Sequence, residues 1–466
     1  MRKLTFLTLL LIFCSFTFAQ KIDLKAKVDE RCELLSTVFR LAGANEYVTH
    51  DIPIYTDSLD KYFEPYKNHE IFKYCNMYRE KYWVGYDAPM SLAIHLQIVD
   101  GKISLIQNVK KNSLDSRWDR NKLPRFIELL NDFYSMSKFH NFFVSQSDFA
   151  EKVEQTATEY FKKIDMEWFK KFFGEVPEGN FNLIISLSNG ENCYGPNVKY
   201  IDNKEDLYSI IVCNIDSLNN PVFDDRWALE LVIHEFCHSF CNPLIMENYS
   251  KMKKKADEFF KIKQNVLKRQ AYSNSQVMLF EILVRASVIK YMADHYPTNT
   301  EKYFPQEKNR GFIWIEELYN SLLNYEQNRV KYPTLKSYMP EIVKLQNELN
   351  PQKIVKKQEK LMPVMSIANI KNNQQDVDAA TTTQIIVKFS KKMNTGANGS
   401  TYGKKGKKYF PKVIDAEWNE ETKTEWILEV KLEQNKEYSI AFPAEWFLSE
   451  DGVNAKNTVY LDFKTK

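Results

Sequence analysis

The chain has 466 residues, of which 44% are hydrophobic, 27% are charged and only 13 are glycine. This composition excludes disordered, collagen-like and low-complexity chains, and the length predicts about three domains. Lysine and arginine total 64 against 61 acidic residues. This near balance argues against a nucleic-acid-binding surface, which needs clustered basic charge.

The amino terminus has the pattern of a secretory leader. A basic start precedes an uncharged run from Leu4 to Phe18, and Ala19 provides a small residue at the expected cut. This run is too short for a spanning helix, and no later stretch is apolar enough to cross a bilayer. We therefore expect residues 1–19 to be a cleaved signal peptide and the protein to be periplasmic or extracellular, without a transmembrane span. Cys14 lacks the small preceding residue that a lipoprotein signal needs, so lipid anchoring is the less favoured alternative.

Residues 20–175 are expected to form a mixed, largely helical amino-terminal region. A helical pattern runs from Val28 to Ala42, and helical periodicity dominates residues 124–174. Two apolar, β-branched segments follow, from Asn180 to Leu187 and from Leu207 to Ile215. They predict two strands separated by glycine-containing turns.

Helices dominate the rest of the second region, which spans residues 176–350. Asp224 or Asp225 is expected to cap an apolar helix from Trp227 to about Cys241, which Asn242-Pro243 ends. A charged helix and three more helical segments are expected after it, at Tyr249–Arg269, Val277–Met292, Trp314–Asn324 and Leu335–Leu349.

Past a basic, polar linker at residues 351–362, the hydrophobic period changes from 3.6 to 2. The alternating segments predict a β-sandwich over residues 363–466. Through Thr381 to Met393 and Asp451-Gly452, this region also resembles the bacterial Ig-like domains of secreted and surface-layer proteins. The resemblance implies a fold and allows attachment to a cell surface. The expected strands are Ile385–Phe389, Trp426–Leu432, Tyr438–Phe442 and Val459–Phe463.

The apolar helix contains the one strong chemical motif, His234-Glu235-Phe236-Cys237-His238. Four residues advance a helix by about 400°, so both imidazoles project from one face within reach of a single ion. Zinc binds imidazole nitrogen and keeps one position open for water in catalytic sites. Glu235 lies to the side of the ligand pair, where it can take a proton from that water. We therefore expect one Zn²⁺ per chain.

The context of the motif supports a metal site. The alternative is a pair of core histidines and a surface glutamate, which would place polar groups in an apolar helix without gain. The strand before the helix is expected to be an edge strand that offers backbone groups to an extended peptide.

A third protein ligand is needed, and two glutamates compete for this role. Glu258 is 20 residues after His238 but stands among lysines, as on a solvated helix face. Glu281 is 43 residues after His238 and is the sole acid of an apolar helix, where a buried carboxylate needs a cation. We favour Glu281, with Arg285 either orienting it or competing as its ion-pair partner.

Other residues rank lower as site candidates. Tyr194, Tyr291 and His295 are candidate oxyanion donors, although most of the 26 tyrosines are expected to be packing residues. Asn242 is expected either to hydrogen-bond a ligand imidazole or to cap the helix. Cys241 is expected to be a core thiol.

At these residues the chain resembles the gluzincin group of zinc metallopeptidases, in which a glutamate on a second helix completes the HExxH site. The resemblance implies a peptidase-like fold, with His234 and His238 as metal ligands, Glu235 as base and Glu281 as third ligand. The chain is also similar, over about residues 25–345, to an uncharacterised family of secreted bacterial proteins, through Glu33 to Gly43, Asn192 to Gly195, His234 to Pro243 and Glu281 to Ala286.

The sequence thus predicts an α+β protein, with a helix-rich, zincin-like metallopeptidase domain that holds a small sheet, followed by an all-β Ig-like sandwich. We expect an exported zinc metallopeptidase that hydrolyses peptide or protein substrates with metal-activated water. One alternative is a non-catalytic surface or binding protein that keeps the peptidase scaffold. Another is a zinc hydrolase that acts on a non-peptide amide or ester.

Overall fold

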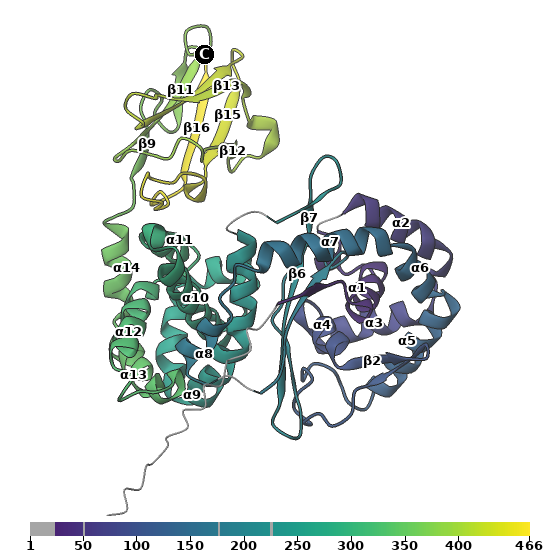
Figure 1. Ribbon diagram of the computed structural model, residues 1–466. Helices are drawn as coiled ribbons and strands as arrows, with labels where there is room; N and C mark the ends of the chain where they lie inside the picture. The colour runs from purple at the N-terminus through teal and green to yellow at the C-terminus, as the bar shows by residue number, and fades with distance from the viewer. Residues whose placement is uncertain (1–23, 50–51, 176–177, 224–226) are drawn as a thin grey trace, which may run out of the picture.

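The computed structural model describes residues 24–49, 52–175, 178–223 and 227–466. The expected signal peptide and the expected cap residues Asp224 and Asp225 lie outside these ranges. Figure 1 shows helices packed around a small sheet, then a group of longer helices, and a β domain at the carboxyl end. The predicted α+β class with a carboxy-terminal β domain is confirmed. Within the described part of the chain, no helix has the length and apolar character needed to span a membrane.

The amino-terminal part consists mainly of helices around α1 (Glu30–Leu41). Asp29 caps α1 by accepting a hydrogen bond from the Arg31 backbone N–H, and the apolar face of the helix is fully buried. The predicted helical character of this part is therefore observed. Its other elements are α2 (Pro53–Phe63), α3 (Glu70–Tyr82), α4 (Asp87–Ile94), the hairpin β2 (Leu96–Val99) and β3 (Lys102–Leu105), α5 (Leu123–Met136), α6 (Phe139–Ser145), α7 (Ser147–Phe161) and α8 (Glu167–Phe173).

A four-stranded sheet with the order β1–β4–β6–β5 lies between the two groups of helices. β1 (Ala26–Lys27), β4 (Phe181–Ser186) and β6 (Glu205–Val212) run parallel, and β5 (Asn197–Lys199) runs antiparallel to β6 at the edge. The expected strand from Leu207 to Ile215 is divided into β6 and a short hairpin. β6 is also an interior strand and not the expected edge, because β5 pairs along its free side. The hairpin consists of β7 (Asn214–Ile215) and β8 (Pro221–Val222).

Helix α9 (Trp227–Arg269) continues for 43 residues, whereas the sequence predicted two helices separated at Asn242-Pro243. A proline inside a helix removes a backbone hydrogen bond and clashes with the preceding turn. Here the buried face continues on both sides of Pro243, through Phe240 and Ile245. This face packs against α10 (Ser275–His295), and its burial keeps the helix continuous across the proline.

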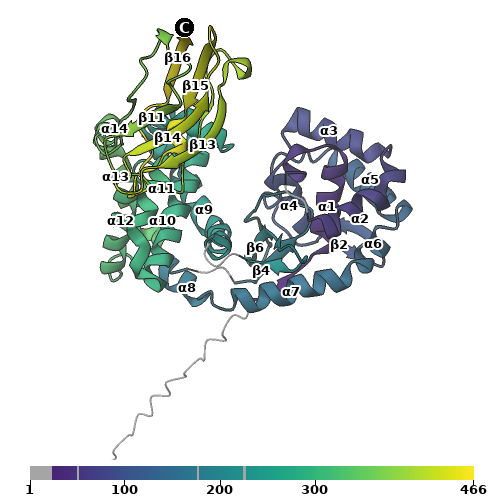
Figure 2. The same ribbon diagram turned by 90° about the horizontal axis from the view of Figure 1, so that it is seen from above.

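One hydrophobic cluster extends from Leu24 to Ile342. The expected division at residues 175 and 176 therefore does not separate two cores, because the central sheet combines β1 with strands that follow in the chain. Figure 2 shows the amino-terminal helices and the α9–α14 group on opposite sides of this sheet, with α7 and α8 running between them. The remaining helices are α11 (Tyr303–Asn309), α12 (Ile315–Gln327), α13 (Leu335–Glu348) and α14 (Pro351–Glu359).

Helix α14 lies where the sequence predicted a polar linker. Asn350 caps this helix by accepting a hydrogen bond from the Lys353 backbone N–H, and Pro351 occupies the first helical position. These two local signals start a helix in a segment with few apolar residues, so the connection to the β domain is helical as far as Glu359.

The carboxy-terminal domain has a hydrophobic cluster of its own, from Met365 to Phe463. Two four-stranded sheets form it, in the orders β10–β16–β15–β12 and β13–β14–β11–β9. Alternating side chains such as Trp426 and Leu428 are buried, as the period of two requires. Its strands are β9 (Met365–Ile367), β10 (Gln374–Val377), β11 (Gln384–Phe389), β12 (Thr401–Tyr402), β13 (Lys412–Trp418), β14 (Glu425–Lys431), β15 (Glu437–Phe442) and β16 (Val459–Thr465).

Candidate metal centre

The ligand residues predicted from the sequence converge in the structure. His234 and His238 lie one turn apart on α9, and their Nε2 atoms are 3.1 Å from each other. The carboxylate oxygens of Glu281 on α10 lie 3.6 Å from His234 Nε2 and 3.5 Å from His238 Nε2. Three ligand atoms about 2.1 Å from a tetrahedral zinc ion would lie about 3.4 Å from one another. The donor set therefore fits zinc in both chemistry and spacing.

Burial prepares His234 for metal binding. Burial lowers the pKa of His234 well below its usual range, and the positive charges of His238, Arg285 and Arg310 lower it further. A neutral imidazole has a lone pair to give to a metal. His238 Nδ1 donates a hydrogen bond to Asn242 Oδ1 over 3.2 Å, which leaves Nε2 as its free acceptor. Asn242 thus hydrogen-bonds a candidate ligand imidazole, which is the first of the two roles expected for it.

Glu235 is buried beside the ligand pair but is not one of the converging ligand residues. Burial raises the pKa of its carboxyl well above the usual range, and the negative charges of Glu281 and Asp87 add to this effect. A carboxylate whose pKa is raised is a stronger base, so this environment suits proton transfer.

Glu281 is held by more than the two histidines. Tyr272 donates a hydrogen bond from its hydroxyl to Glu281 Oε2 over 3.1 Å. The Arg285 guanidinium lies 3.2 Å from the same oxygen and donates to the Tyr272 hydroxyl over 2.9 Å. On its other side, Arg285 contacts both carboxylate oxygens of Glu307 at 3.0 and 3.2 Å. The two explanations weighed for Glu281, a metal and Arg285, are therefore compatible in one site.

Tyr272 and Glu307 are absent from the residues that the sequence singled out. Tyr272 lies in the polar break between α9 and α10, and Glu307 lies on the charged helix α11. Neither position belongs to a motif with ligand spacing, and only the tertiary structure brings Glu307 on α11 to Arg285 on α10. The sole signal in the sequence was Arg285, a buried cation that needs more than one anionic partner.

Glu258, the competing third ligand, is not in the group of converging ligands. Its carboxylate pairs with Lys255 at 2.8 Å, and 38% of its side chain is exposed. This is the solvated helix face that the surrounding lysines predicted.

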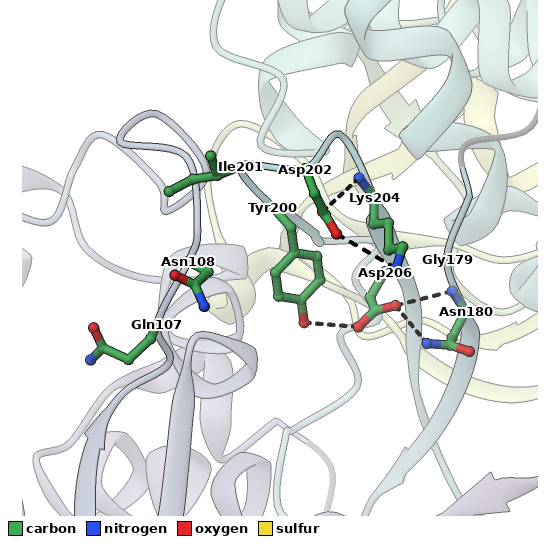
Figure 3. Close-up of a pocket in the computed structure, with 9 residues that line it drawn as sticks. All are labelled: Gln107, Asn108, Gly179, Asn180, Tyr200, Ile201, Asp202, Lys204 and Asp206. Atoms are coloured by element: carbon green, nitrogen blue, oxygen red, sulfur yellow. Dashed lines mark hydrogen bonds and ion pairs between the residues drawn. The ribbon is translucent and has the colours of Figure 1, made fainter.

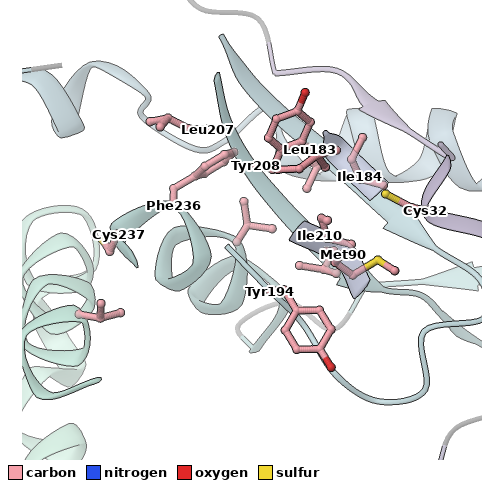
Figure 4. Close-up of a cluster of buried hydrophobic side chains, with 14 of the residues drawn as sticks. Cys32, Met90, Leu183, Ile184, Tyr194, Leu207, Tyr208, Ile210, Phe236 and Cys237 are labelled. Atoms are coloured by element: carbon pink, nitrogen blue, oxygen red, sulfur yellow. The ribbon is translucent and has the colours of Figure 1, made fainter. Parts of the chain in front are cut away.

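Two of the candidate oxyanion donors, Tyr291 and His295, lie apart from the ligand residues. The Tyr291 hydroxyl accepts a hydrogen bond from the Asp165 backbone N–H, and His295 Nε2 lies 3.3 Å from the Asp165 carboxylate. Ten residues separate Glu281 from Tyr291, so along a helix the two are about 15 Å apart. Tyr194 has a buried hydroxyl that points away from Phe236 on α9 (Figure 4). The geometry does not support an oxyanion donor at Tyr291 or His295, and the role of Tyr194 stays a prediction.

Two other predicted features have structural roles. Cys241 Sγ lies 3.7 Å from Ser287 Oγ in the interface between α9 and α10, as expected of a core thiol. Glu33, from the segment Glu33 to Gly43, is fully buried and accepts hydrogen bonds from Ser186 Oγ, the Leu187 backbone N–H and Ser188 Oγ, each at 2.8 Å. This carboxylate joins α1 to the end of β4 and positions the chain that follows.

The segment Asn192–Gly195 lies directly beside the base. Gly195 packs so closely on the Glu235 carbonyl that an added Cβ would stand 2.1 Å from this oxygen. The Tyr194 backbone pairs with Ile210 of β6 on one side. In the described part of the chain, no hydrogen bond is made by the backbone N–H or C=O of Cys193 or Gly195. These groups form an unpaired edge next to Glu235.

A separate hollow lies at the other end of this sheet edge (Figure 3). Its polar groups bond to one another, since Asp206 accepts hydrogen bonds from the Tyr200 hydroxyl at 2.9 Å and from the Asn180 side chain at 2.8 Å. None of its lining residues belongs to the metal centre, and the hollow therefore adds nothing to the site.

Comparisons with known proteins give one family. No curated protein matches the chain. Two solved structures of the bacterial S-layer protein SbsC are 13% and 12% identical, with TM-scores of 0.18 and 0.17; they cover 50% and 54% of this chain and 33% and 60% of their own. Likeness at this level carries no argument about fold or function. A family model matches residues 22–345, which is more than two thirds of the chain and includes the whole metal centre. The chain therefore belongs to the family described as "Domain of unknown function (DUF4932)".

Proposed function

We propose that this protein is an exported zinc-dependent metallopeptidase of the gluzincin type. The observation that carries the proposal is the convergence of His234, His238 and Glu281, with ligand atoms 3.1 to 3.6 Å apart, beside the buried Glu235. Export rests on the leader pattern of residues 1–19, and the carboxy-terminal sandwich is proposed to attach the enzyme to a cell surface.

The residues of the site divide the chemistry among them. His234, His238 and Glu281 would hold one zinc ion, which supplies a Lewis acid and a water molecule of lowered pKa when bound. With zinc in place, Glu235 would act as the general base towards a water molecule and would pass the proton to the leaving amine, a role that suits a carboxylate with a raised pKa. Asn242 orients His238 and Tyr272 orients Glu281, each through a hydrogen bond to that ligand side chain.

A peptide substrate is supported by the unpaired backbone at Cys193 and Gly195. An extended chain that pairs with these groups would lie along the edge of the sheet, next to Glu235. Gly195 keeps this edge close to Glu235, because the Gly195 backbone packs directly on the Glu235 carbonyl, where a side chain would have no room. A peptide bond is therefore favoured over a non-peptide amide or ester as the group that is cleaved.

The proposal is tested by metal content and by turnover together. Purified protein should contain about one zinc per chain and should cleave a denatured-protein mixture in a way that a chelator abolishes. Glu235→Gln should keep the zinc and lose at least about a hundredfold in turnover, whereas the control variant Glu258→Gln should keep both. Zinc without hydrolysis in the wild type would favour the non-catalytic binding protein. Absence of any transition metal in protein never exposed to a chelator would refute the site.

A further inference from the structure

Helices α10 and α11 hold a buried row of alternating charges next to the metal centre. The Arg285 guanidinium lies 3.2 Å from Glu281 Oε2 and donates to both carboxylate oxygens of Glu307, over 3.0 and 3.2 Å. The side chains of Glu281, Arg285 and Glu307 are only 10%, 13% and 7% exposed. One buried cation therefore stands between two buried carboxylates.

The guanidinium of Arg285 is fixed between these carboxylates. Its Nη1 atom makes both hydrogen bonds to Glu307, whereas its Nη2 atom faces Glu281 and donates to the Tyr272 hydroxyl over 2.9 Å. The Phe312 ring covers the guanidinium in a cation–π contact, with 4.8 Å between Cζ and the ring centroid. Because the planar fork is held at both ends, the charge of Arg285 is shared between Glu307 and Glu281.

The sharing is unequal and favours Glu307. Arg285 makes two hydrogen bonds to Glu307 and approaches Glu281 as an ion pair. Arg310 lies 2.9 Å from Glu307 Oε1, but its side chain is 52% exposed, so water weakens its effect. Buried carboxylates need a cationic partner each, and Arg285 is the buried cation that both acids share. The Glu281 carboxylate therefore keeps negative charge for a metal ion.

Without the charge of Glu307, the same guanidinium would compete with the metal. A cation buried beside Glu281 with no other carboxylate would hold Glu281 through its full charge, since charges interact strongly where water is excluded. It would also repel a divalent ion bound by His234, His238 and Glu281. Glu307 thus decides whether Arg285 orients the third ligand or withdraws it.

On the basis of the proposed function, we infer that Glu307 is a positioning residue of the metal centre. It neutralises Arg285 and so leaves the Glu281 carboxylate available as the third ligand, while Arg285 and Tyr272 orient that carboxylate. Glu307 lies on a different helix from each of the three ligands and acts on zinc affinity through Arg285.

The zinc affinity of the full chain, measured by competition with a chromophoric chelator, tests this role. Glu307→Gln keeps the size of the side chain and removes its charge, so zinc affinity should fall by about tenfold or more. Glu307→Asp keeps the charge and should lose less affinity than Glu307→Gln. The matched control is Glu326→Gln, which removes a carboxylate 2.6 Å from Lys290, another buried cation of α10. This control should lower the Tm and leave zinc affinity unchanged.

A double variant separates charge from packing. Arg285→Met combined with Glu307→Gln removes both buried charges, so it should bind zinc more tightly than Glu307→Gln alone, although it has lost more contacts. Weaker binding by the double variant than by Glu307→Gln would show that the pair acts through packing and would overturn the inference. Unchanged zinc affinity in Glu307→Gln would overturn it as well.

Two further outcomes have a fixed meaning. If Glu307→Gln does not fold, the double variant is compared with the wild type: zinc affinity within about tenfold supports the inference, and a larger loss overturns it. Absence of zinc binding by the wild type would overturn the proposed function, and the inference with it.

Discussion

At the residue scale, the Glu281 carboxylate of the metal centre is buried among several polar side chains. It is 8% exposed, and one of its oxygens lies within 3.6 Å of His234, Tyr272 and Arg285 alike. A carboxylate in such a place is held by several donors, and a metal ion would join Arg285 as a second cation.

We predict that Glu281→Gln weakens zinc binding by more than about 100-fold, because a ligand oxygen and its charge are lost. Glu258→Gln should leave the affinity close to unchanged, since Glu258 pairs with Lys255 on the helix surface. Competition with a chromophoric chelator measures both affinities. A larger loss of zinc affinity in Glu258→Gln than in Glu281→Gln would overturn the assignment. Equally small losses in both variants would indicate that Glu281 pairs with Arg285 alone.

Tyr272 provides a second prediction at this scale. Tyr272→Phe removes the hydroxyl that donates to Glu281 and accepts from Arg285, so zinc affinity should fall by about 10- to 100-fold. Tyr249→Phe is the matched control, because the Tyr249 hydroxyl bonds Ser275 at 2.9 Å, away from the ligands. Equal zinc affinity in wild type and Tyr272→Phe, by the same chelator titration, would show that Arg285 orients Glu281 without help.

At the scale of elements, His95 at the end of α4 joins three segments. Its Nδ1 donates to the Ser91 carbonyl over 2.7 Å, and its Nε2 accepts from Ser113 Oγ over 2.7 Å. Ser113 Oγ in turn accepts the Lys199 backbone N–H of β5 over 2.8 Å. Only a neutral imidazole can accept from Ser113, and burial lowers the pKa of His95 to about 4.

Acidification should therefore loosen this junction. The unfolded chain takes up a proton at His95 near pH 6.5, whereas the folded chain does so only near pH 4. Between these values the free energy of unfolding should fall by about 1.4 kcal/mol per pH unit, or about 3 kcal/mol in total, and above pH 6.5 the effect should vanish.

Denaturant unfolding at pH 7 and pH 4.5 measures this loss. His95→Gln should be less stable than the wild type at pH 7 and should lose less stability on acidification, because it has no group to protonate. Parallel slopes for wild type and His95→Gln would contradict the prediction.

At the scale of the whole molecule, the sandwich and the body have separate hydrophobic clusters. Few polar contacts join them. Asn309 donates from Nδ2 to the Gly452 carbonyl over 2.8 Å and accepts the Asn454 backbone N–H at Oδ1 over 3.4 Å. Two ion pairs join Arg269 to Glu445 at 3.5 Å and Lys456 to Glu359 at 3.8 Å. Because the ion pairs are exposed and one hydrogen bond is long, these contacts contribute about 1 to 2 kcal/mol together.

We predict that a chain ending near Lys360 folds, binds zinc with nearly the affinity of the full chain and keeps any hydrolytic activity. Its Tm should fall by no more than a few degrees, because the lost contacts contribute only about 1 to 2 kcal/mol to the free energy of unfolding. Asn309→Ala in the full chain serves as the comparison, because it removes both hydrogen bonds of Asn309 to the sandwich and keeps the sandwich. Insoluble or metal-free shortened protein would show that the sandwich supports the body through α11, the helix that carries Glu307.

Local signals in the sequence determined much of this protein. The spacing of His234 and His238 placed both imidazoles on one helical face, and the apolar surroundings of Glu281 marked it as a buried acid in need of a cation. The change of hydrophobic period near Pro363 marked the start of the sandwich. These predictions hold because each depends on the geometry of a single element, which its own residues specify.

Other features were decided only by the tertiary structure. Pro243 predicted a break, yet packing of α9 on α10 keeps the helix continuous. Tyr272 and Glu307 support Glu281, although the segments that contain them carry no motif. Gly195 lies against Glu235 because the edge of the sheet next to β6 is occupied by a strand that the sequence did not reveal. Contacts of this kind join residues far apart in the chain, so they depend on how finished elements pack together and leave no periodic pattern along the sequence.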